Sequence, residues 1–275
     1  MSGTDLNNCA SCPVHNLGNL KKLGINMSNF DFVVALAGNP NTGKSTVFNY
    51  LTGLRQHTGN WPGKTVTRAE GGFEYSDKKF KVVDLPGTYS LLSTSTDEEV
   101  ARDFILFGQP DVTVIVVDAT RVERNLNLVL QILEITDRAI VCLNLMDEVR
   151  RNGIEIDERT LSKELGVPVI PAAARQGEGM NELLNMIFEV SSGKYVCSPH
   201  RIRTSSKELN FAVEKLSREI IKEFPNLPNT RWVALRLLEG DQSIIDAIRS
   251  GELGNLKKEE TLVEVSQLSH SEIRY

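Results

Sequence analysis

A glycine-rich octapeptide, G-N-P-N-T-G-K-S at residues 38–45, constrains this chain more than any other feature. The apolar run before it, residues 32–37, predicts a strand, and residues 44–53 predict a helix that begins inside the motif. Successive N–H groups in such a loop form a concave anion site, and the helix N-terminus adds free donors and partial positive charge. The sequence therefore predicts that a nucleotide's phosphates lie against Gly38, Asn39, Pro40, Asn41, Thr42, Gly43, Lys44, Ser45 and Thr46.

Two side chains of this motif carry most of its chemistry. Lys44 can reach the β- and γ-phosphates, and the Ser45 hydroxyl can bind Mg²⁺. The alternative is a glycine-rich turn that merely precedes a helix. The Lys-Ser pair, placed between a strand and a helix, favours the phosphate-binding loop.

Composition narrows the classes of function. The 275 residues include 31 basic and 36 acidic side chains, so no basic excess indicates non-specific nucleic-acid binding. No apolar run reaches the roughly 18 residues of a membrane-spanning helix, and the N-terminus lacks a signal-peptide pattern. The four scattered cysteines are typical of a reducing cytosol rather than of a disulfide framework.

Residues 1–29 are expected to be an appendage. Cys9, Cys12 and His15 place three metal-ligand side chains close together, but a fourth is missing. A partly ordered tail with exposed thiols, or part of a site completed elsewhere, is the favoured interpretation.

The middle of the chain alternates between strand and helix patterns, which predicts an α/β fold with a mostly parallel sheet covered on both faces. Arg55–Lys64 is expected to be a loop, and two strands around residues 76–78 are expected to form a hairpin. The expected strands cover 32–37, 65–75, 79–83, 112–117, 139–143 and 167–170. The expected helices cover 44–53, 97–107, 125–136, 157–165 and 180–190.

After residue 194 the pattern becomes helical throughout. Apolar side chains between Leu209 and Ile221 recur mostly three and four residues apart, as they do on the buried face of a helix. We therefore expect three regions: an appendage at 1–29, an α/β nucleotide-binding domain at 30–194 and a small all-α domain at 195–275.

A second phosphate-side motif ends the strand at 79–83. In Asp84-Leu85-Pro86-Gly87, the carboxylate can hold Mg²⁺ through water and the Gly87 N–H can contact a γ-phosphate. Upstream, Thr65 can complete the Mg²⁺ shell, although a Thr that simply enters a strand is the default alternative. The residues expected near the phosphates there are Gly63, Lys64 and Thr65.

A third motif, Asn144-Leu145-Met146-Asp147, follows an apolar strand. The Asp147 carboxylate can accept two N–H bonds from the edge of guanine, which adenine cannot donate. Asn144 would tie this loop to the phosphate loop. A simple helix N-cap is the alternative, and the presence of a phosphate loop favours base recognition. Backbone N–H groups near the guanine O6 would come from Ala172, Ala173 and Ala174.

The order of these motifs resembles the Ras-like small GTPase fold, and their residues resemble the FeoB-type ferrous iron transporters. The helical segment Arg231–Asp241 is similar to the domain, described as GDP-dissociation-inhibitor-like, that follows the GTPase in this family. The motifs that carry the resemblance are residues 38–45, Phe48-Asn49, Leu51-Thr52-Gly53, Gly59–Val66, Asp84–Leu91 and Asn144–Asp147.

The resemblance implies GTP binding and hydrolysis that regulate Fe²⁺ uptake through a membrane domain of the same protein, at the cytoplasmic side of the inner membrane. The implied partners are GTP or GDP and that membrane domain; a homo-oligomer stays open, and nucleic acid is not expected. The chain stops at Tyr275, about where the membrane part should begin. Ala173 stands where the family usually has Ser, which leaves guanine contact there to backbone groups and suggests faster nucleotide release.

The sequence lacks the glutamine that usually assists GTP hydrolysis. In Ras-like proteins a Gln after D-x-x-G orients the attacking water, but Thr88 and Tyr89 follow Gly87 here. An Arg from a partner or a monovalent cation could supply the missing charge. The resemblance links Asn41 to K⁺, with the carbonyls of Gly59 and Trp61 as further ligands; the alternative is that Asn41 only shapes the turn. We expect K⁺-stimulated hydrolysis with Lys44, Thr65 and Asn41 as the catalytic groups.

Two other functions can be compared with this one. An ATP-driven P-loop machine is disfavoured by the Asn144–Asp147 motif. A nucleotide switch for ribosome or RNA assembly would be expected to carry a basic appendage, whereas the helical tail mixes signs, as in Lys257-Lys258-Glu259-Glu260.

Overall fold

The computed structural model describes residues 20–54, 56–92, 95–201, 206–225, 227 and 229–250, so Cys9, Cys12 and His15 lie outside the described residues. Contacts divide the chain into two compact units, with the division between residues 205 and 206. The sequence places the change of fold earlier, near residue 195. The difference arises because Ser198 and His200 donate backbone hydrogen bonds to the carbonyls of Gly166 and Leu165, 3.0 Å each, which keeps this stretch with the first unit.

The first unit is built on one seven-stranded sheet with the strand order β2-β3-β4-β1-β5-β6-β7. Its strands are β1 (Phe32–Gly38), β2 (Gln56–Asn60), β3 (Thr67–Tyr75), β4 (Lys78–Asp84), β5 (Val112–Asp118), β6 (Ala139–Asn144) and β7 (Val169–Pro171). Its helices are α2 (Lys44–Thr52), α3 (Thr96–Gly108), η2 (Ala119–Arg121), α4 (Val122–Ile135), α5 (Met146–Arg151), α6 (Glu158–Leu165) and α7 (Met180–Ser191).

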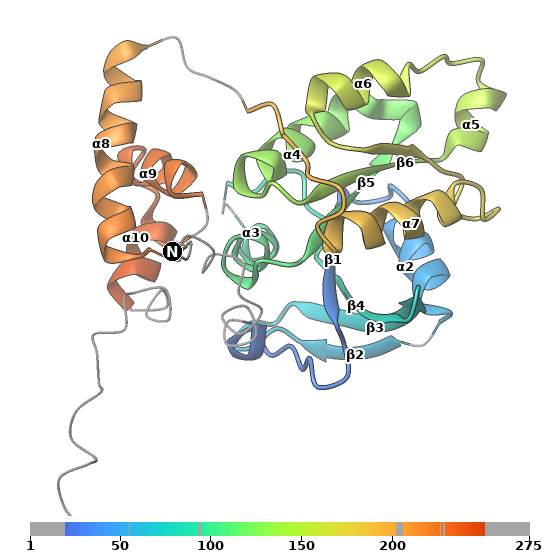
Figure 1. Cartoon of the computed structure of the whole chain (residues 1–275), viewed down its shortest axis with the longest axis horizontal. Coiled ribbons are helices and arrows are strands. Elements are labelled where there is room, and N and C mark those ends of the chain that lie inside the picture. The colour runs from blue at the N-terminus through green and yellow to red at the C-terminus, as the bar shows by residue number, and fades with distance from the viewer. Residues whose placement is uncertain are drawn as a thin grey trace, which may run out of the picture. The chain divides into compact units, whose positions relative to one another are not determined.

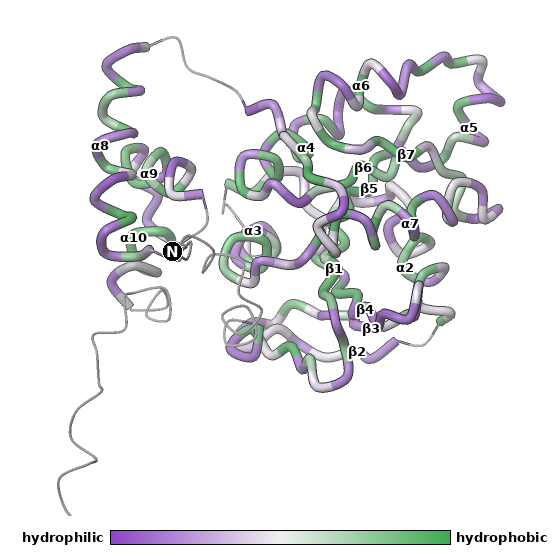
Figure 2. Tube along the Cα trace, viewed as in Figure 1, coloured by the Kyte–Doolittle hydropathy of each residue, from purple (hydrophilic) through white to green (hydrophobic). Residues whose placement is uncertain are grey.

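The sheet is parallel from β4 to β7 and antiparallel at the β2-β3-β4 edge. Helices α3 and α4 lie on one face, and α2 and α7 on the other (Figure 1). Strands β1, β5 and β6 are almost wholly buried and strongly apolar, as strands covered on both faces must be (Figure 2). The predicted α/β class is therefore confirmed, and the three sequence motifs follow the carboxyl ends of β1, β4 and β6, where ligands of such sheets bind.

One local prediction was wrong, and one short helix was not predicted. The stretch expected to be a loop, Arg55–Lys64, contains the edge strand β2, whose five residues are all exposed. Its polar sequence Q-H-T-G-N has no apolar alternation, so only its antiparallel pairing with β3 defines it. The short helix α5, which begins at Met146, was also missed, because six residues are too few to show a helical period.

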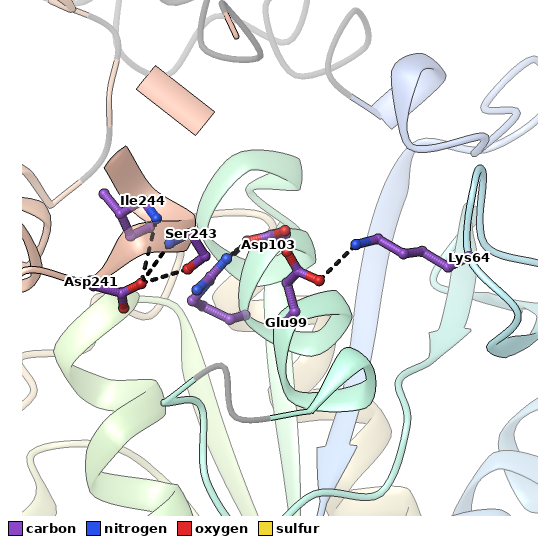
Figure 3. Close-up of polar contacts among 7 residues, drawn as sticks. Lys64, Glu99, Asp103, Asp241, Ser243 and Ile244 are labelled. Atoms are coloured by element: carbon purple, nitrogen blue, oxygen red, sulfur yellow. Dashed lines mark hydrogen bonds and ion pairs between the residues drawn. The ribbon is translucent and has the colours of Figure 1, made fainter. Parts of the chain in front are cut away.

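The second unit, as far as it is described, contains α8 (Lys207–Glu223), α9 (Thr230–Leu238) and α10 (Gln242–Ser250). Each helix begins with a side-chain cap: Ser206 and Asn229 accept from Leu209 N–H and Trp232 N–H, and Asp241 accepts from Ser243 and Ile244 (Figure 3). The apolar pattern is only partly buried, because Val213 and Ile220 lie in the core whereas Leu209 and Ile221 are exposed. None of the helices in the described part of the chain has the length and apolar character that a bilayer crossing requires.

Candidate active site

The phosphate loop between β1 and α2 offers a row of uncommitted backbone donors. Among the described residues, no acceptor meets the N–H groups of residues 41–45, and the first N–H that finds one is that of Thr46, which donates to Gly43 O at 2.9 Å. Asn41 adopts φ 65° and Gly43 φ 81°, so the loop curls in the left-handed region that Asn and Gly tolerate. Five neighbouring donors at the start of a helix form a cradle for a polyphosphate.

Lys44 links this loop to the D-x-x-G loop after β4. Its Nζ forms an ion pair with Asp84 Oδ1 and donates to Leu85 O at 2.7 Å. Burial raises the pKa of the Asp84 carboxyl above its usual value, and the nearby Lys44 ammonium opposes that rise. The side chains for which the sequence predicts phosphate and Mg²⁺ binding are therefore in direct contact with each other.

The D-x-x-G loop also touches the phosphate loop through its backbone. Thr88 N–H donates to Gly38 O at 3.3 Å, and a Cβ added to Gly87 would lie 3.4 Å from Pro40 N. Thr88 is buried, whereas Tyr89 is exposed and its ring lies under the Arg124 guanidinium at 4.8 Å. The position that follows the motif thus holds a buried hydroxyl in place of a Gln amide.

Asn144 ties the predicted base loop to the phosphate loop, as the sequence predicts. Its Nδ2 donates to Thr42 O at 3.0 Å, and its Oδ1 accepts from Ala174 N–H at 3.0 Å. The side chain is almost fully buried, and a Cβ at Gly43 would come within 2.3 Å of its Nδ2. Only glycine therefore fits at position 43, and Asn144 fixes the phosphate loop, β6 and the loop after β7 together.

The expectation that Ala172, Ala173 and Ala174 donate to guanine O6 needs correction. Their N–H groups already donate to Leu143 O, Glu178 O and Asn144 Oδ1. The next N–H, that of Arg175, meets no acceptor among the described residues. Arg175 is thus the better candidate for this contact; the sequence could not reveal it, because the availability of an N–H depends on tertiary hydrogen bonds.

Asp147, the candidate for guanine recognition, is bonded by a side chain of the same loop after β7. Its Oδ2 accepts from Gln176 Nε2 at 3.2 Å and lies 3.7 Å from Arg151. Arg150, on the same short helix, forms a two-bond pair with Glu178 at 2.6 Å. These contacts position α5 against the loop after β7, and the sequence patterns gave no sign of Gln176 or Glu178.

The segment Gly59–Thr65, called the Trp61 loop below, contacts other neighbours than the phosphate loop. Trp61 is buried with its ring edge against Phe104, their centroids 5.4 Å apart. Lys64 pairs with Glu99 of α3 at 2.6 Å (Figure 3). Thr65 is exposed, and no hydrogen bond or ion pair of the described residues joins this loop to Lys44, Ser45 or Asp84.

The oxygen atoms near the phosphate loop can be compared with the ligands expected for Mg²⁺ and K⁺. The Ser45 hydroxyl and the Asp84 carboxylate are oxygen ligands of the kind Mg²⁺ prefers, and they flank the phosphate cradle, so these residues fit that ion. For K⁺, the carbonyl of Trp61 accepts from Lys64 N–H at 3.0 Å, and among the described residues no hydrogen bond joins Asn41 to Gly59 or Trp61.

Many nucleotide-binding proteins place a phosphate loop at this edge of a parallel sheet. The Asn144 side chain joins that loop to the loop after β7, and it begins an N-x-x-D motif; together these features narrow the class to the Ras-like P-loop GTPases. The chain belongs to the FeoB family: the model described as ferrous iron transport protein B matches residues 32–187, and the one described as the FeoB cytosolic helical domain matches residues 206–272.

Known relatives agree with this assignment. The Fe(2+) transporter FeoB of Salmonella typhimurium is 42% identical over 212 residues, which is 76% of this chain and 27% of that protein. The chain thus spans about a quarter of the length of the curated relatives it matches. The crystal structure of the cytosolic domain of the T. maritima FeoB iron transporter in a GDP form is 36% identical with a TM-score of 0.71, covering 86% of this chain and 89% of the other. The cytosolic domain of L. pneumophila FeoB is 33% identical with a TM-score of 0.70, covering 83% and 90%.

Proposed function

We propose that this chain is the guanine-nucleotide switch of a ferrous iron transporter, and that it binds GTP with Mg²⁺ and hydrolyses it to GDP and phosphate. The observation that carries the proposal is the Asn144 side chain, which bonds both the phosphate loop and the loop after β7. This arrangement fixes the distance between a phosphate cradle and a base-reading carboxylate, as recognition of a whole nucleotide requires.

Each part of the site has a role in this proposal. The uncommitted N–H groups of residues 41–45 and the Lys44 ammonium bind the phosphates. Ser45, Thr65 and Asp84 would hold Mg²⁺, which would supply positive charge opposite the β- and γ-phosphates. Asp147 accepts from the guanine edge, and Arg175 donates its N–H to O6.

We place this switch on the cytoplasmic side of a membrane, next to a transport domain of the same protein. The support comes from relatives that are about four times longer than the matched segment and are named Fe(2+) transporters. GTP binding and release would then control passage of Fe²⁺, the cargo, through that domain. A role in RNA assembly has less support, because the chain carries a net charge of −5.

We also propose that K⁺ stimulates hydrolysis. Thr88 and Tyr89 leave the D-x-x-G loop without a water-orienting amide, so charge developing between the β- and γ-phosphates needs another partner. Asn41 lies in the phosphate loop with an exposed side chain, where its amide oxygen can reach an ion beside the phosphates. Completion of the site would require the Trp61 loop to move, because its carbonyls lie elsewhere in this structure.

Hydrogen exchange can test whether the Trp61 loop changes its mobility with the bound nucleotide. The amides of Gly59, Gly63 and Thr65 should exchange with solvent more slowly when a non-hydrolysable GTP analogue replaces GDP, because contact of Thr65 with Mg²⁺ orders the loop. Hydrogen exchange followed by mass spectrometry measures this, with β6 peptides as the unchanging reference. Identical exchange of the loop with both nucleotides would contradict the switch assignment.

A further inference from the structure

Residues 20–30, called the strap below, form a segment that precedes the region matched by the family model at 32–187. It is drawn in dark blue in Figure 1. A helical turn ends at Gly24, where Gly24 N–H bonds Lys21 O at 3.0 Å and Ile25 N–H bonds Leu20 O at 2.8 Å. Gly24 adopts φ 79°, so these bonds form a glycine-terminated helix end. Leu20 and Ile25 are each only 2% exposed, so the strap is packed onto the domain.

Arg68 of β3 connects the strap to the Trp61 loop. Its Nη1 and Nη2 donate to the last carbonyls of the turn, Leu23 O at 2.8 Å and Gly24 O at 3.1 Å. A cation at a helix C-terminus is electrostatically favourable. The same guanidinium lies over the Trp61 ring at 5.2 Å, and its Nε is 2.7 Å from Glu70 Oε1. Arg68 therefore holds the strap and Trp61 at once.

Lys81 of β4 makes a second attachment. Its Nζ donates to Asn26 O at 3.0 Å, pairs with Glu70 Oε2 at 2.5 Å and lies 5.3 Å from the centre of the Phe30 ring. Glu70 thus holds both cations, and the side chains of Arg68, Glu70 and Lys81 are each at most 12% exposed. Charge pairs with so little solvent around them are screened less than surface pairs, so Glu70 holds Arg68 and Lys81 where they bond the strap carbonyls.

Gly24 touches the Trp61 loop directly. A Cβ added to Gly24 would lie 2.8 Å from Arg68 Nη1 and 3.0 Å from Pro62 Cγ. Glycine at this position therefore allows the strap to close over both groups. Trp61 is buried beneath these contacts, and its Nε1 has no acceptor in the described structure. A buried indole N–H without a partner is unfavourable, so the arrangement depends on its surrounding contacts.

We propose that the strap is a brake on the Trp61 loop. Through Arg68 and Pro62 it stabilises the arrangement in which, among the described residues, no hydrogen bond or ion pair joins Thr65 to Lys44, Ser45 or Asp84, and it thereby slows GTP turnover. The inference rests on the proposed role of this loop as the switch. In this account Arg68 is a positioning residue, since it acts on the phosphate site only through the loop.

Gly24→Ala tests the brake, because it changes the strap alone. The matched control is Gly193→Ala, which has a similar φ of 74° but no atom within 4 Å of the added Cβ. Trp61 and Trp232 are the two tryptophans, so a Trp232→Phe background makes Trp61 the sole fluorophore. We expect Gly24→Ala to increase acrylamide quenching of Trp61 and to raise kcat about three- to tenfold with KM nearly unchanged, and Gly193→Ala to do neither.

Arg68→Met gives a second route to the same result, because Met keeps an apolar stem over Trp61 but cannot bond the strap carbonyls. Thermal unfolding identifies any variant that fails to fold. If Gly24→Ala does not fold, the quenching and turnover of Arg68→Met test the brake. Unchanged quenching and turnover in the folded variants, or slower turnover, would overturn the brake. Trp61 quenching that is equal with GDP and a GTP analogue in the Trp232→Phe protein without further substitutions would instead contradict the switch assignment, so the two failures are distinguishable.

Discussion

Asp147→Asn should weaken GTP binding by about 10²- to 10⁴-fold and should favour xanthosine triphosphate over GTP. The carboxylate accepts two hydrogen bonds from the guanine N1 and N2 groups, and the amide replaces one acceptor with a donor. That donor suits the carbonyl that xanthine carries in place of the guanine amine. Competition against a fluorescent guanine nucleotide measures both affinities.

Glu148→Gln is the control for this substitution. Glu148 is the next residue, exposed and in the first turn of the same helix α5, so its removal takes away the same charge without touching the base. We expect its nucleotide affinities to match those of the natural protein. A loss of GTP affinity as large as that of Asp147→Asn would mean that charge near α5, rather than hydrogen bonding to the base, controls binding.

GTP hydrolysis should be about 10²- to 10³-fold faster in K⁺ than in Na⁺ at equal ionic strength, which is the usual effect of one well-placed electrostatic contact. Na⁺ is smaller and fits poorly in a cage of carbonyl and amide oxygens sized for K⁺. Steady-state phosphate release with saturating Mg²⁺ and GTP provides the measurement.

The substitutions at Asn41 should respect its backbone. Asn41 adopts φ 65°, where alanine would be strained, so Asn41→Gly removes the amide and keeps the loop conformation. We expect Asn41→Gly to abolish the difference between the two salts and Asn41→Asp, which retains an oxygen, to preserve part of it. Equal rates in K⁺ and Na⁺ for the natural protein would leave an Arg supplied by a partner as the better explanation.

Local sequence was a good guide wherever one short segment carries both the geometry and the chemistry. The phosphate loop could be predicted because its glycines and its Lys-Ser pair lie in one eight-residue stretch between a strand pattern and a helix pattern. The Asn144 bridge was also predictable, since the loops after β1 and β6 of a parallel sheet meet at the same edge. The spacing of the motifs along the chain was therefore enough to predict which loops lie together at this edge of the sheet.

Features that depend on tertiary neighbours could not be predicted. Strand β2 is polar and exposed, so only its partner β3 makes it a strand. In the loop after β7, the N–H of Arg175 has no acceptor among the described residues, whereas the N–H groups of residues 172–174 already have acceptors. Arg68 has the pattern of an ordinary strand residue, yet it joins the strap, Glu70 and Trp61. These contacts join residues whose sequence neighbours give no sign of the pairing.

The most direct test of the account is a comparison of GTP with ATP in the unmodified chain with Mg²⁺ present. We expect phosphate release from GTP, no measurable release from ATP, and no inhibition of GTP hydrolysis by ATP in excess, because adenine offers Asp147 no N–H pair. Lys44→Ala should remove the activity and so exclude a contaminating enzyme. Equal binding or hydrolysis of ATP would contradict the assignment of this site as a guanine-nucleotide switch.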